Sequence, residues 1–271
     1  MRVRVRVVIA VLLAVSAAAC SNTPTMPTTP ITTDPPPLPP PTPRLSMTKF
    51  LAFGDSITEG KTTSFNLHAM TVGPCGTGEQ QFCQAVSYPF KLQALLASRY
   101  TDQKIDVWNA ASGGEQAANG LPRLDDALRE VNPEVLLLMD GANDLIAFGE
   151  PGIPQAVEAI RVLVRDAMAH GAKVMLATLP PQVPNTQRGG AAPFLFKFND
   201  SLKSMGVKEG AYIVDIYANF DVGLQGPDGL HPSDAGYTRI AEIFRDRIRE
   251  TFETPTRAPT LTGERSRREW R

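Results

Sequence analysis

The chain has 271 residues, with 27 Lys or Arg and 28 Asp or Glu, which gives a formal net charge of −1. A balance this even excludes a strongly basic protein that binds nucleic acid electrostatically, so no nucleic-acid partner is expected. Between two segments of unusual composition at its ends, residues 47–252 remain, which is enough for one domain with a full hydrophobic core.

The first 19 residues have the pattern of a secretory signal peptide. Arg2, Arg4 and Arg6 precede an apolar run over residues 7–15, and small residues follow that run. A basic start, a short apolar centre and a small-residue cleavage site are typical of such signals. The apolar run is shorter than the roughly 20 residues that cross a bilayer. We therefore expect an exported protein.

Cys20 ends a stretch, AAAC, that resembles a bacterial lipobox, although Ala17 stands where Leu is usual. The resemblance implies that Cys20 becomes the first mature residue and carries several acyl chains, which anchor a protein stably to a membrane. The alternative is an ordinary secretory signal before an incidental cysteine. The expected location is the cell envelope: the periplasmic side if the cell has two membranes, in which case Ser21 after Cys20 fits sorting to the outer one, or the outside of a cell with a single membrane.

The segments that flank the domain have compositions that do not favour folding. Residues 20–46 follow the cleavage site and hold ten of the 24 prolines, interleaved with Thr and Ser. This composition predicts an extended linker that lifts the domain off the membrane; the alternative is a Pro-rich ligand for a partner domain. Residues 253–271 are polar and end in an Arg-rich stretch, which predicts a disordered basic tail.

Within the domain, apolar strand patterns alternate with helical ones. Strands are expected at 49–53, 105–108, 135–139, 174–177 and 212–217, and helices at 88–99, 124–131, 155–170, 194–207 and 233–252. This alternation predicts a parallel sheet with helices on both faces. In such a sheet the functional site lies beyond the carboxyl ends of the strands.

Two cysteines remain when Cys20 is assigned to lipid. Cys75 and Cys83 bound the loop segment CGTGEQQFC. Because the chain is expected to leave the cytoplasm, we predict a disulfide between them. Two thiols without a flanking histidine do not favour a metal site, and no metal is expected.

The stretch FLAFGDSITEGKT, residues 50–62, admits two interpretations. A phosphate-binding loop requires four residues between its first glycine and Gly-Lys, but Gly54 and Gly60 enclose five. Asp55 and Glu59 would also repel a phosphate. The other interpretation, a strand that presents Ser56 as a nucleophile at the following turn, is therefore favoured over a phosphate site.

A serine nucleophile needs a general base and a carboxylate that orients it. His231 lies in GPDGLHPSDAG with Asp228 three residues before it, so a short turn can bring the carboxylate to the imidazole. His170 ends a predicted helix before a glycine, which indicates a structural role. His68 falls in the long loop after Ser56 and is a weaker candidate for contact with substrate.

Four motifs follow predicted strands in a fixed order. They are GDS at 54–56, the glycines of NAASGG at 109–114, GAND at 141–144 and DGLHP at 228–232. In combination they resemble the SGNH hydrolase superfamily, the GDSL lipases and esterases, over most of residues 47–252. The resemblance implies a flavodoxin-like three-layer α/β/α sandwich with a five-stranded parallel sheet.

The resemblance also implies a role for each matching residue. Ser56 corresponds to the nucleophile, His231 to the general base and Asp228 to the residue that orients it. The oxyanion hole corresponds to the backbone N–H of Ser56, that of Gly114 and the side-chain amide of Asn143. Gly113 is the alternative backbone donor because the glycine is doubled. Asp55 and Asp144 are expected to be structural, and no cofactor is required.

These residues predict a carboxylester hydrolase that works through an acyl-enzyme on Ser56. The expected substrate is a small ester, a lipid or an acetylated glycan. The alternatives are a carbohydrate O-acetylesterase and, from a different class, a non-catalytic lipoprotein that binds a glycan or a partner. The sequence does not indicate which acyl chain or alcohol is preferred, nor the oligomeric state.

Overall fold

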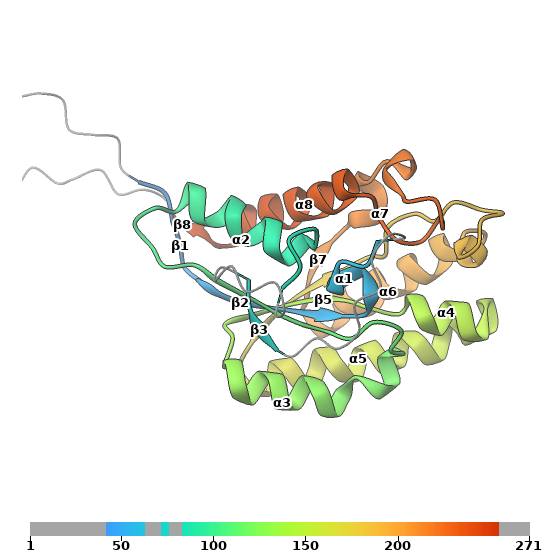
Figure 1. The fold of residues 1–271 in the computed structure, drawn as a ribbon. Coiled ribbons are helices and arrows are strands. Elements are labelled where there is room, and N and C mark those ends of the chain that lie inside the picture. Colours follow the sequence, from blue (N-terminus) through green and yellow to red (C-terminus); the bar gives the residue numbers. More distant parts are fainter. Residues whose placement is uncertain (1–41, 63–71, 76–82, 255–271) are drawn as a thin grey trace, which may run out of the picture. The chain divides into compact units, whose positions relative to one another are not determined.

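A mostly parallel sheet forms the centre of the domain (Figure 1). The structure, a computed structural model, describes residues 42–62, 72–75 and 83–254. The sheet order is β3 (Gly73–Pro74), β4 (Asp106–Ala111), β2 (Lys49–Gly54), β5 (Val135–Met139), β6 (Lys173–Ala177) and β7 (Tyr212–Val214). Every neighbouring pair is parallel except β3 and β4. The predicted five-stranded parallel sheet is thus present, with one short antiparallel strand added at its edge.

Helices cover both faces of this sheet (Figure 1). On one face α2 (Tyr88–Arg99) packs against α8 (Asp234–Phe252), and on the other α5 (Ile153–Ala169) packs against both α3 (Leu121–Val131) and α6 (Leu195–Glu209). The strand β5 between these layers is completely buried because all five of its residues are apolar. This arrangement confirms the three-layer α/β/α architecture.

Three strands end level with one another at the edge that carries the site. Gly54 is paired with Ala111 of β4 on one side and with Met139 of β5 on the other. At Gly54, where φ is +155°, an added Cβ would lie 2.0 Å from the Met139 carbonyl oxygen, so a side chain there would force β2 and β5 apart. β4 lies on one side of β2 and β5 on the other, so the strand order reverses at β2. Open α/β sheets bind ligands at such a switch point.

The helix starts show why several elements begin where they do. Ser87 and Ser233 cap α2 and α8 by accepting hydrogen bonds from the N–H groups of Phe90 and Gly236. Three short helices were not predicted: α1 (Ser56–Glu59), α4 (Ala142–Phe148) and α7 (Ile216–Asn219). Short 3₁₀ turns complete the connections at Ala117–Asn119, Glu150–Gly152, Gly189–Ala191 and Val222–Leu224.

The strand predicted at 212–217 is too long, and this is a correction. β7 ends at Val214, because Asp215 accepts a hydrogen bond from the Ala218 N–H at 3.2 Å and so caps α7. Asp215 also accepts hydrogen bonds from Thr178 and Lys203, which hold its carboxylate in the capping position.

The described domain reaches slightly beyond residues 47–252. β1 (Arg44–Leu45) pairs antiparallel with β8 (Glu253–Thr254), so residues assigned to the linker and to the tail meet in a two-stranded ribbon. Glu253 secures this ribbon by accepting two hydrogen bonds from Arg99 and one from the Tyr100 hydroxyl. The signal peptide, Cys20 and His68 lie outside the described residues.

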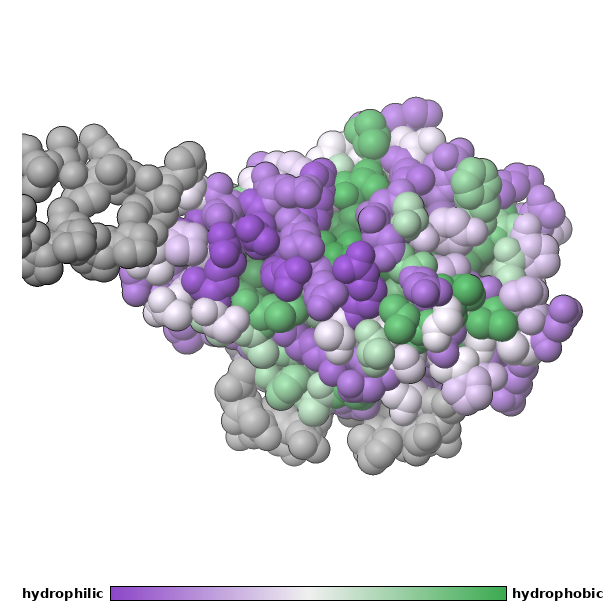
Figure 2. Space-filling model, turned by 90° about the horizontal axis from the view of Figure 1, so that it is seen from above, coloured by the Kyte–Doolittle hydropathy of each residue, from purple (hydrophilic) through white to green (hydrophobic). Residues whose placement is uncertain are grey.

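The predicted disulfide between Cys75 and Cys83 is present, with the two Cα atoms 5.0 Å apart. Seen from the side of α2 and α8, hydrophilic residues dominate the surface and apolar residues form small separate areas (Figure 2). Among the helices that the structure describes, none has both the length and the apolar character needed to cross a bilayer.

Candidate active site

Ser56 lies at the first position of α1, directly after β2. The Asp55 side chain accepts a hydrogen bond from the Ile57 N–H at 2.9 Å and caps this helix, and Gly60 ends it with φ of +91°. The short helix therefore turns the chain sharply at the carboxyl end of β2. It leaves Ser56 only 3% exposed, with its Oγ 2.9 Å from Nε2 of His231.

His231 and Asp228 lie together in the loop that precedes α8. Nδ1 of His231 is 2.6 Å from Oδ2 of Asp228. The other carboxylate oxygen of Asp228 accepts hydrogen bonds from the N–H groups of Leu230 and His231, each at 3.0 Å. The structure thus joins all three predicted residues into one chain from Ser56 through His231 to Asp228. This arrangement lets the imidazole accept the serine proton while the carboxylate fixes its tautomer.

The charges around this chain keep the carboxylate ionised and the imidazole neutral. Burial raises the pKa of Asp228, but the hydrogen bonds from the His231 side chain and from two backbone N–H groups outweigh it, so this pKa lies below its ordinary value. Burial lowers the pKa of His231, and the positive charges of Arg188 and Lys61 lower it further, while Asp228 opposes them. The resting enzyme therefore presents a neutral base to Ser56.

This electrostatic setting predicts the pH dependence of the activity. Because neutral His231 is the active form and its pKa is lowered, kcat/KM for a neutral ester should fall on the acid side with a midpoint below the ordinary histidine value of about 6.5. The measurement is a pH profile of kcat/KM from pH 4.5 to 8 with a substrate that does not titrate. A midpoint clearly above 6.5 would contradict the prediction.

The loop after β4 lies against the nucleophile. A Cβ added at Gly113 would lie 3.6 Å from the Ser56 Cβ and 2.2 Å from a carboxylate oxygen of Glu59, so a side chain there would displace the Glu59 carboxylate. Gly114 has φ of +84°, and a Cβ there would have no heavy atom within 4 Å. In the described part of the chain, the N–H groups of both glycines make no hydrogen bond to protein. Both remain available to an oxyanion beside Ser56.

Asn143 reaches the same place from the first turn of α4. Its Nδ2 donates to the Glu115 carbonyl at 3.0 Å and to Oδ2 of Asp55 at 3.3 Å. The first bond fixes the amide against the loop that holds Gly114. The longer bond, to Asp55, which directly precedes Ser56, is the weaker of the two and the easier one for the amide to give up to an oxyanion.

We predict that Asn143→Ala lowers kcat for ester hydrolysis by about 10²–10³-fold, the usual cost of removing one oxyanion donor. KM should change little, because the donor acts mainly on the charge that develops in the transition state. Steady-state kinetics with p-nitrophenyl acetate tests this, with Asn219→Ala on α7 as the matched control. A loss below fivefold would remove Asn143 from the oxyanion hole.

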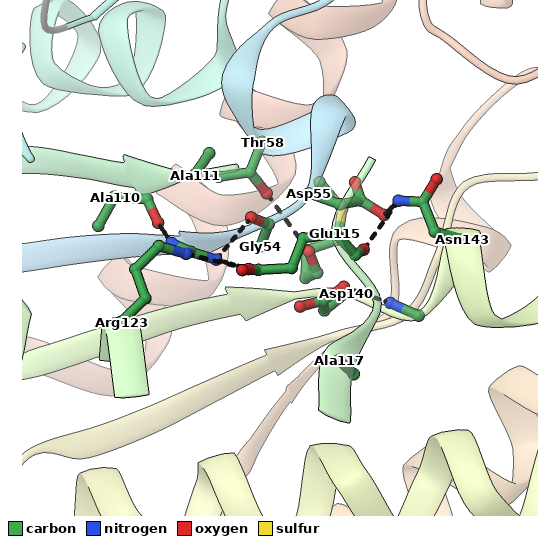
Figure 3. A network of polar contacts seen from close by, with 12 residues as sticks. Gly54, Asp55, Thr58, Ala110, Ala111, Glu115, Ala117, Arg123, Asp140 and Asn143 are labelled. Atoms are coloured by element: carbon green, nitrogen blue, oxygen red, sulfur yellow. Dashed lines mark hydrogen bonds and ion pairs between the residues drawn. The ribbon is translucent and has the colours of Figure 1, made fainter. Parts of the chain in front are cut away.

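Arg123 links the ends of β2 and β4 to Glu115 in the loop after β4 (Figure 3). From α3, its guanidinium donates to the Ala110 and Gly54 carbonyls and to the Glu115 carboxylate, and it lies 3.9 Å from the centre of the Phe53 ring. One cation thus holds the ends of β2 and β4 and the residue whose carbonyl anchors Asn143. The sequence analysis did not identify Arg123 or Glu115, and no local motif marks them.

Buried carboxyl groups surround this network, and their pKa values are raised. Burial, together with the nearby charges of Asp144 and Glu59, raises the pKa of Asp55 to about 7. Burial and the charge of Asp55 raise the pKa of Asp140 well above its ordinary value. A raised pKa favours the neutral form of a carboxyl group, which opposes a developing oxyanion less than a carboxylate does.

Three other residues singled out in the sequence, Asp144, His170 and Lys61, lie outside the triad. Asp144 accepts a hydrogen bond from the Ala117 N–H at 3.0 Å, a structural contact. His170 lies at the end of α5 beside Asp125 and Asp166, and its ring does not contact the triad. Lys61 follows Gly60, and its carbonyl accepts a hydrogen bond from the Tyr237 hydroxyl.

Comparison with known sequences agrees with this geometry. The profile of the GDSL-like lipase/acylhydrolase family matches residues 52–239, which is more than half of the chain. A multidomain esterase of Ruminococcus flavefaciens is 25% identical over 233 residues, a match that takes in 76% of this chain. This chain spans only 29% of the length of that relative.

Comparison with solved structures supports the fold. An acetylxylan esterase from Geobacillus stearothermophilus has a TM-score of 0.61 and 21% identity, over 74% of this chain and 94% of the other. A psychrotrophic esterase from a Pseudoalteromonas species has a TM-score of 0.55 and 21% identity, over 74% and 96% of the two chains. At these identities the likeness extends to the fold alone.

Proposed function

The chain belongs to the GDSL-like lipase/acylhydrolase family, and on this premise we propose that it is a carboxylester hydrolase that forms an acyl-enzyme on Ser56. The observation that carries the proposal is the unbroken chain of hydrogen bonds from Ser56 through His231 to Asp228, at 2.9 and 2.6 Å. A serine hydroxyl is a weak nucleophile unless a base in contact with it removes its proton.

The reaction has two halves, and His231 transfers a proton in each. Ser56 Oγ attacks the ester carbonyl as Nε2 of His231 takes its proton, and the oxyanion meets the N–H groups of Ser56 and Gly114 and the amide of Asn143. The intermediate collapses, and the alcohol leaves with the proton from His231. Water then attacks the acyl-enzyme with His231 as base, which releases the carboxylic acid and free Ser56.

A fluorophosphonate probe tests the proposal directly, because it phosphonylates an activated serine and ignores a binding protein. We expect one equivalent of label on the peptide that contains Ser56, together with turnover of p-nitrophenyl acetate, butyrate or octanoate. No label and no turnover would favour the non-catalytic glycan- or partner-binding lipoprotein.

A carbohydrate O-acetylesterase is the second candidate. It is favoured by the similarity of the fold to an acetylxylan esterase, with 94% of that chain covered. Release of acetate from acetylated xylooligosaccharides, compared with hydrolysis of p-nitrophenyl octanoate, separates the two. Efficient deacetylation without octanoate turnover would assign the narrower function, and the reverse would assign a general esterase.

We further propose that the enzyme is exported and tethered to the envelope through lipid on Cys20, which the AAAC sequence before a proline-rich linker supports. Metabolic labelling with a palmitate analogue is the test. Label should enter the wild-type protein and be absent from Cys20→Ser, and equal labelling of both would refute lipidation at this residue.

A further inference from the structure

A groove opens beside the triad, between α4 and the segment from Gln187 to Phe194. It has a volume of about 470 Å³, with Leu145, Ile146 and Phe194 as apolar walls and Arg188 as its cation. Two of its residues are close in the chain or by hydrogen bond to residues of the site. Ile146 lies three residues after Asn143 on α4, and the Arg188 N–H donates to the Asp228 carbonyl at 2.8 Å.

Arg188 is a half-buried cation that lacks a counter-charge. In the described part of the chain its guanidinium makes no ion pair and no hydrogen bond, whereas Arg99, Arg123 and Arg165 all bind carboxylates. A partly desolvated guanidinium is a strong and often bidentate ligand for carboxylate and phosphate. The groove therefore offers an unused anion-binding group within the site.

The position of this cation has a consequence for catalysis. Acylation turns His231 into an imidazolium, and the charge of Arg188 opposes that change. Lys61 acts in the same direction, while Asp228 favours the imidazolium. A substrate anion bound to Arg188 would cancel its repulsion of the imidazolium. Such a substrate would gain in kcat as well as in binding.

We propose that the preferred substrates carry an anionic group, a carboxylate or a phosphate, on the alcohol half of the ester, and that Arg188 binds this group. The proposal rests on the proposed ester hydrolysis at Ser56. The alcohol half is assigned to this groove because His231 must protonate the leaving oxygen, so the alcohol lies next to the imidazole, and Arg188 is joined by its backbone N–H to Asp228 of the same loop. The apolar walls contact the uncharged part of the same alcohol.

Matched pairs of acetyl esters test the proposal with the purified protein. One pair is 3-acetoxybenzoate and 3-acetoxybenzamide, and the other is 1-acetylglycerol 3-phosphate and 1-acetylglycerol. In the wild type we expect kcat/KM to be about tenfold to a hundredfold higher for the anionic member, as for a charge-assisted hydrogen bond. A larger ratio in the second pair identifies phosphate as the preferred anion, and a larger ratio in the first identifies carboxylate.

Variants show whether Arg188 is responsible. Arg188→Gln should bring the ratio close to one and move the acid limb for the neutral ester to higher pH, because a positive charge near His231 is removed. Arg188→Lys should keep part of the preference. Arg165→Gln, on the exposed side of α5, should leave the ratio unchanged.

The outcomes separate this proposal from the one on which it rests. Turnover of both members of each pair at equal kcat/KM, or a preference that Arg188→Gln leaves intact, would overturn the role of Arg188 while ester hydrolysis stands. Absence of turnover for every ester, together with absence of fluorophosphonate labelling, would overturn both proposals.

Discussion

Ser56→Ala is expected to lower kcat for p-nitrophenyl acetate by about 10⁶-fold. The remaining rate is that of direct attack by water on an ester held in the oxyanion hole. The reason is that His231 then has no nucleophile at 2.9 Å to deprotonate. The donors of the oxyanion hole, including the backbone N–H of residue 56, are all retained and still bind the carbonyl oxygen, so KM should change far less than kcat.

The control for this loss is Ser98→Ala, which removes an exposed hydroxyl from α2. Both variants should unfold at temperatures close to that of the wild type, because Ser56 contributes one buried hydrogen bond worth about 1 kcal/mol. If Ser56→Ala kept more than a hundredth of the wild-type kcat, the acyl-enzyme mechanism on this residue would have to be abandoned.

Asp228→Asn is the second large effect, with kcat expected to fall by about 10⁴-fold. Asparagine can retain the oxygen that accepts the N–H groups of Leu230 and His231, so the loop should keep its shape. Its amide nitrogen would face Nδ1 of His231 and donate a hydrogen bond to it. The imidazole ring must then carry its proton on Nε2. That tautomer cannot accept the proton of Ser56.

Asp221→Asn provides the matched control, since Asp221 is an exposed carboxylate that caps a nearby 3₁₀ turn and does not contact the triad. Steady-state kinetics at pH 7 should show near wild-type kcat for this variant. A loss below tenfold in Asp228→Asn would mean that the carboxylate does not set the tautomer of His231.

The elements that the sequence predicted well are those with long apolar patterns. The run at β5 is buried on both faces, and α2 and α8 show serine caps before their first turns. The helices α1, α4 and α7 escaped prediction because four to seven residues contain at most two turns, too few to establish a period. The extension of β7 to residue 217 failed because apolar residues continue into α7 after the capping Asp215.

The catalytic residues were predictable for a different reason. Ser56, Asp228 and His231 occur in short motifs whose spacing already carries the chemistry, as does Asn143 in GAND. The residues that support them carry no such signal. Arg123 is 69 positions from Gly54 in sequence, and its contacts exist only because β2 and β4 end side by side.

The sequence by itself determined the alternating strands and helices, the parallel character of the sheet and the identities of the nucleophile, the base and the orienting carboxylate. These follow from local periodicity and from spacings of a few residues, which a single chain displays directly. Only the tertiary structure decided how Asn143 is held by Glu115 and Asp55, how Arg123 joins the ends of β2 and β4, and that the guanidinium of Arg188, beside Asp228, has no carboxylate partner among the described residues. Hydrogen bonds and electrostatic interactions act across space between segments far apart in sequence, so they appear only when packing has brought those segments together.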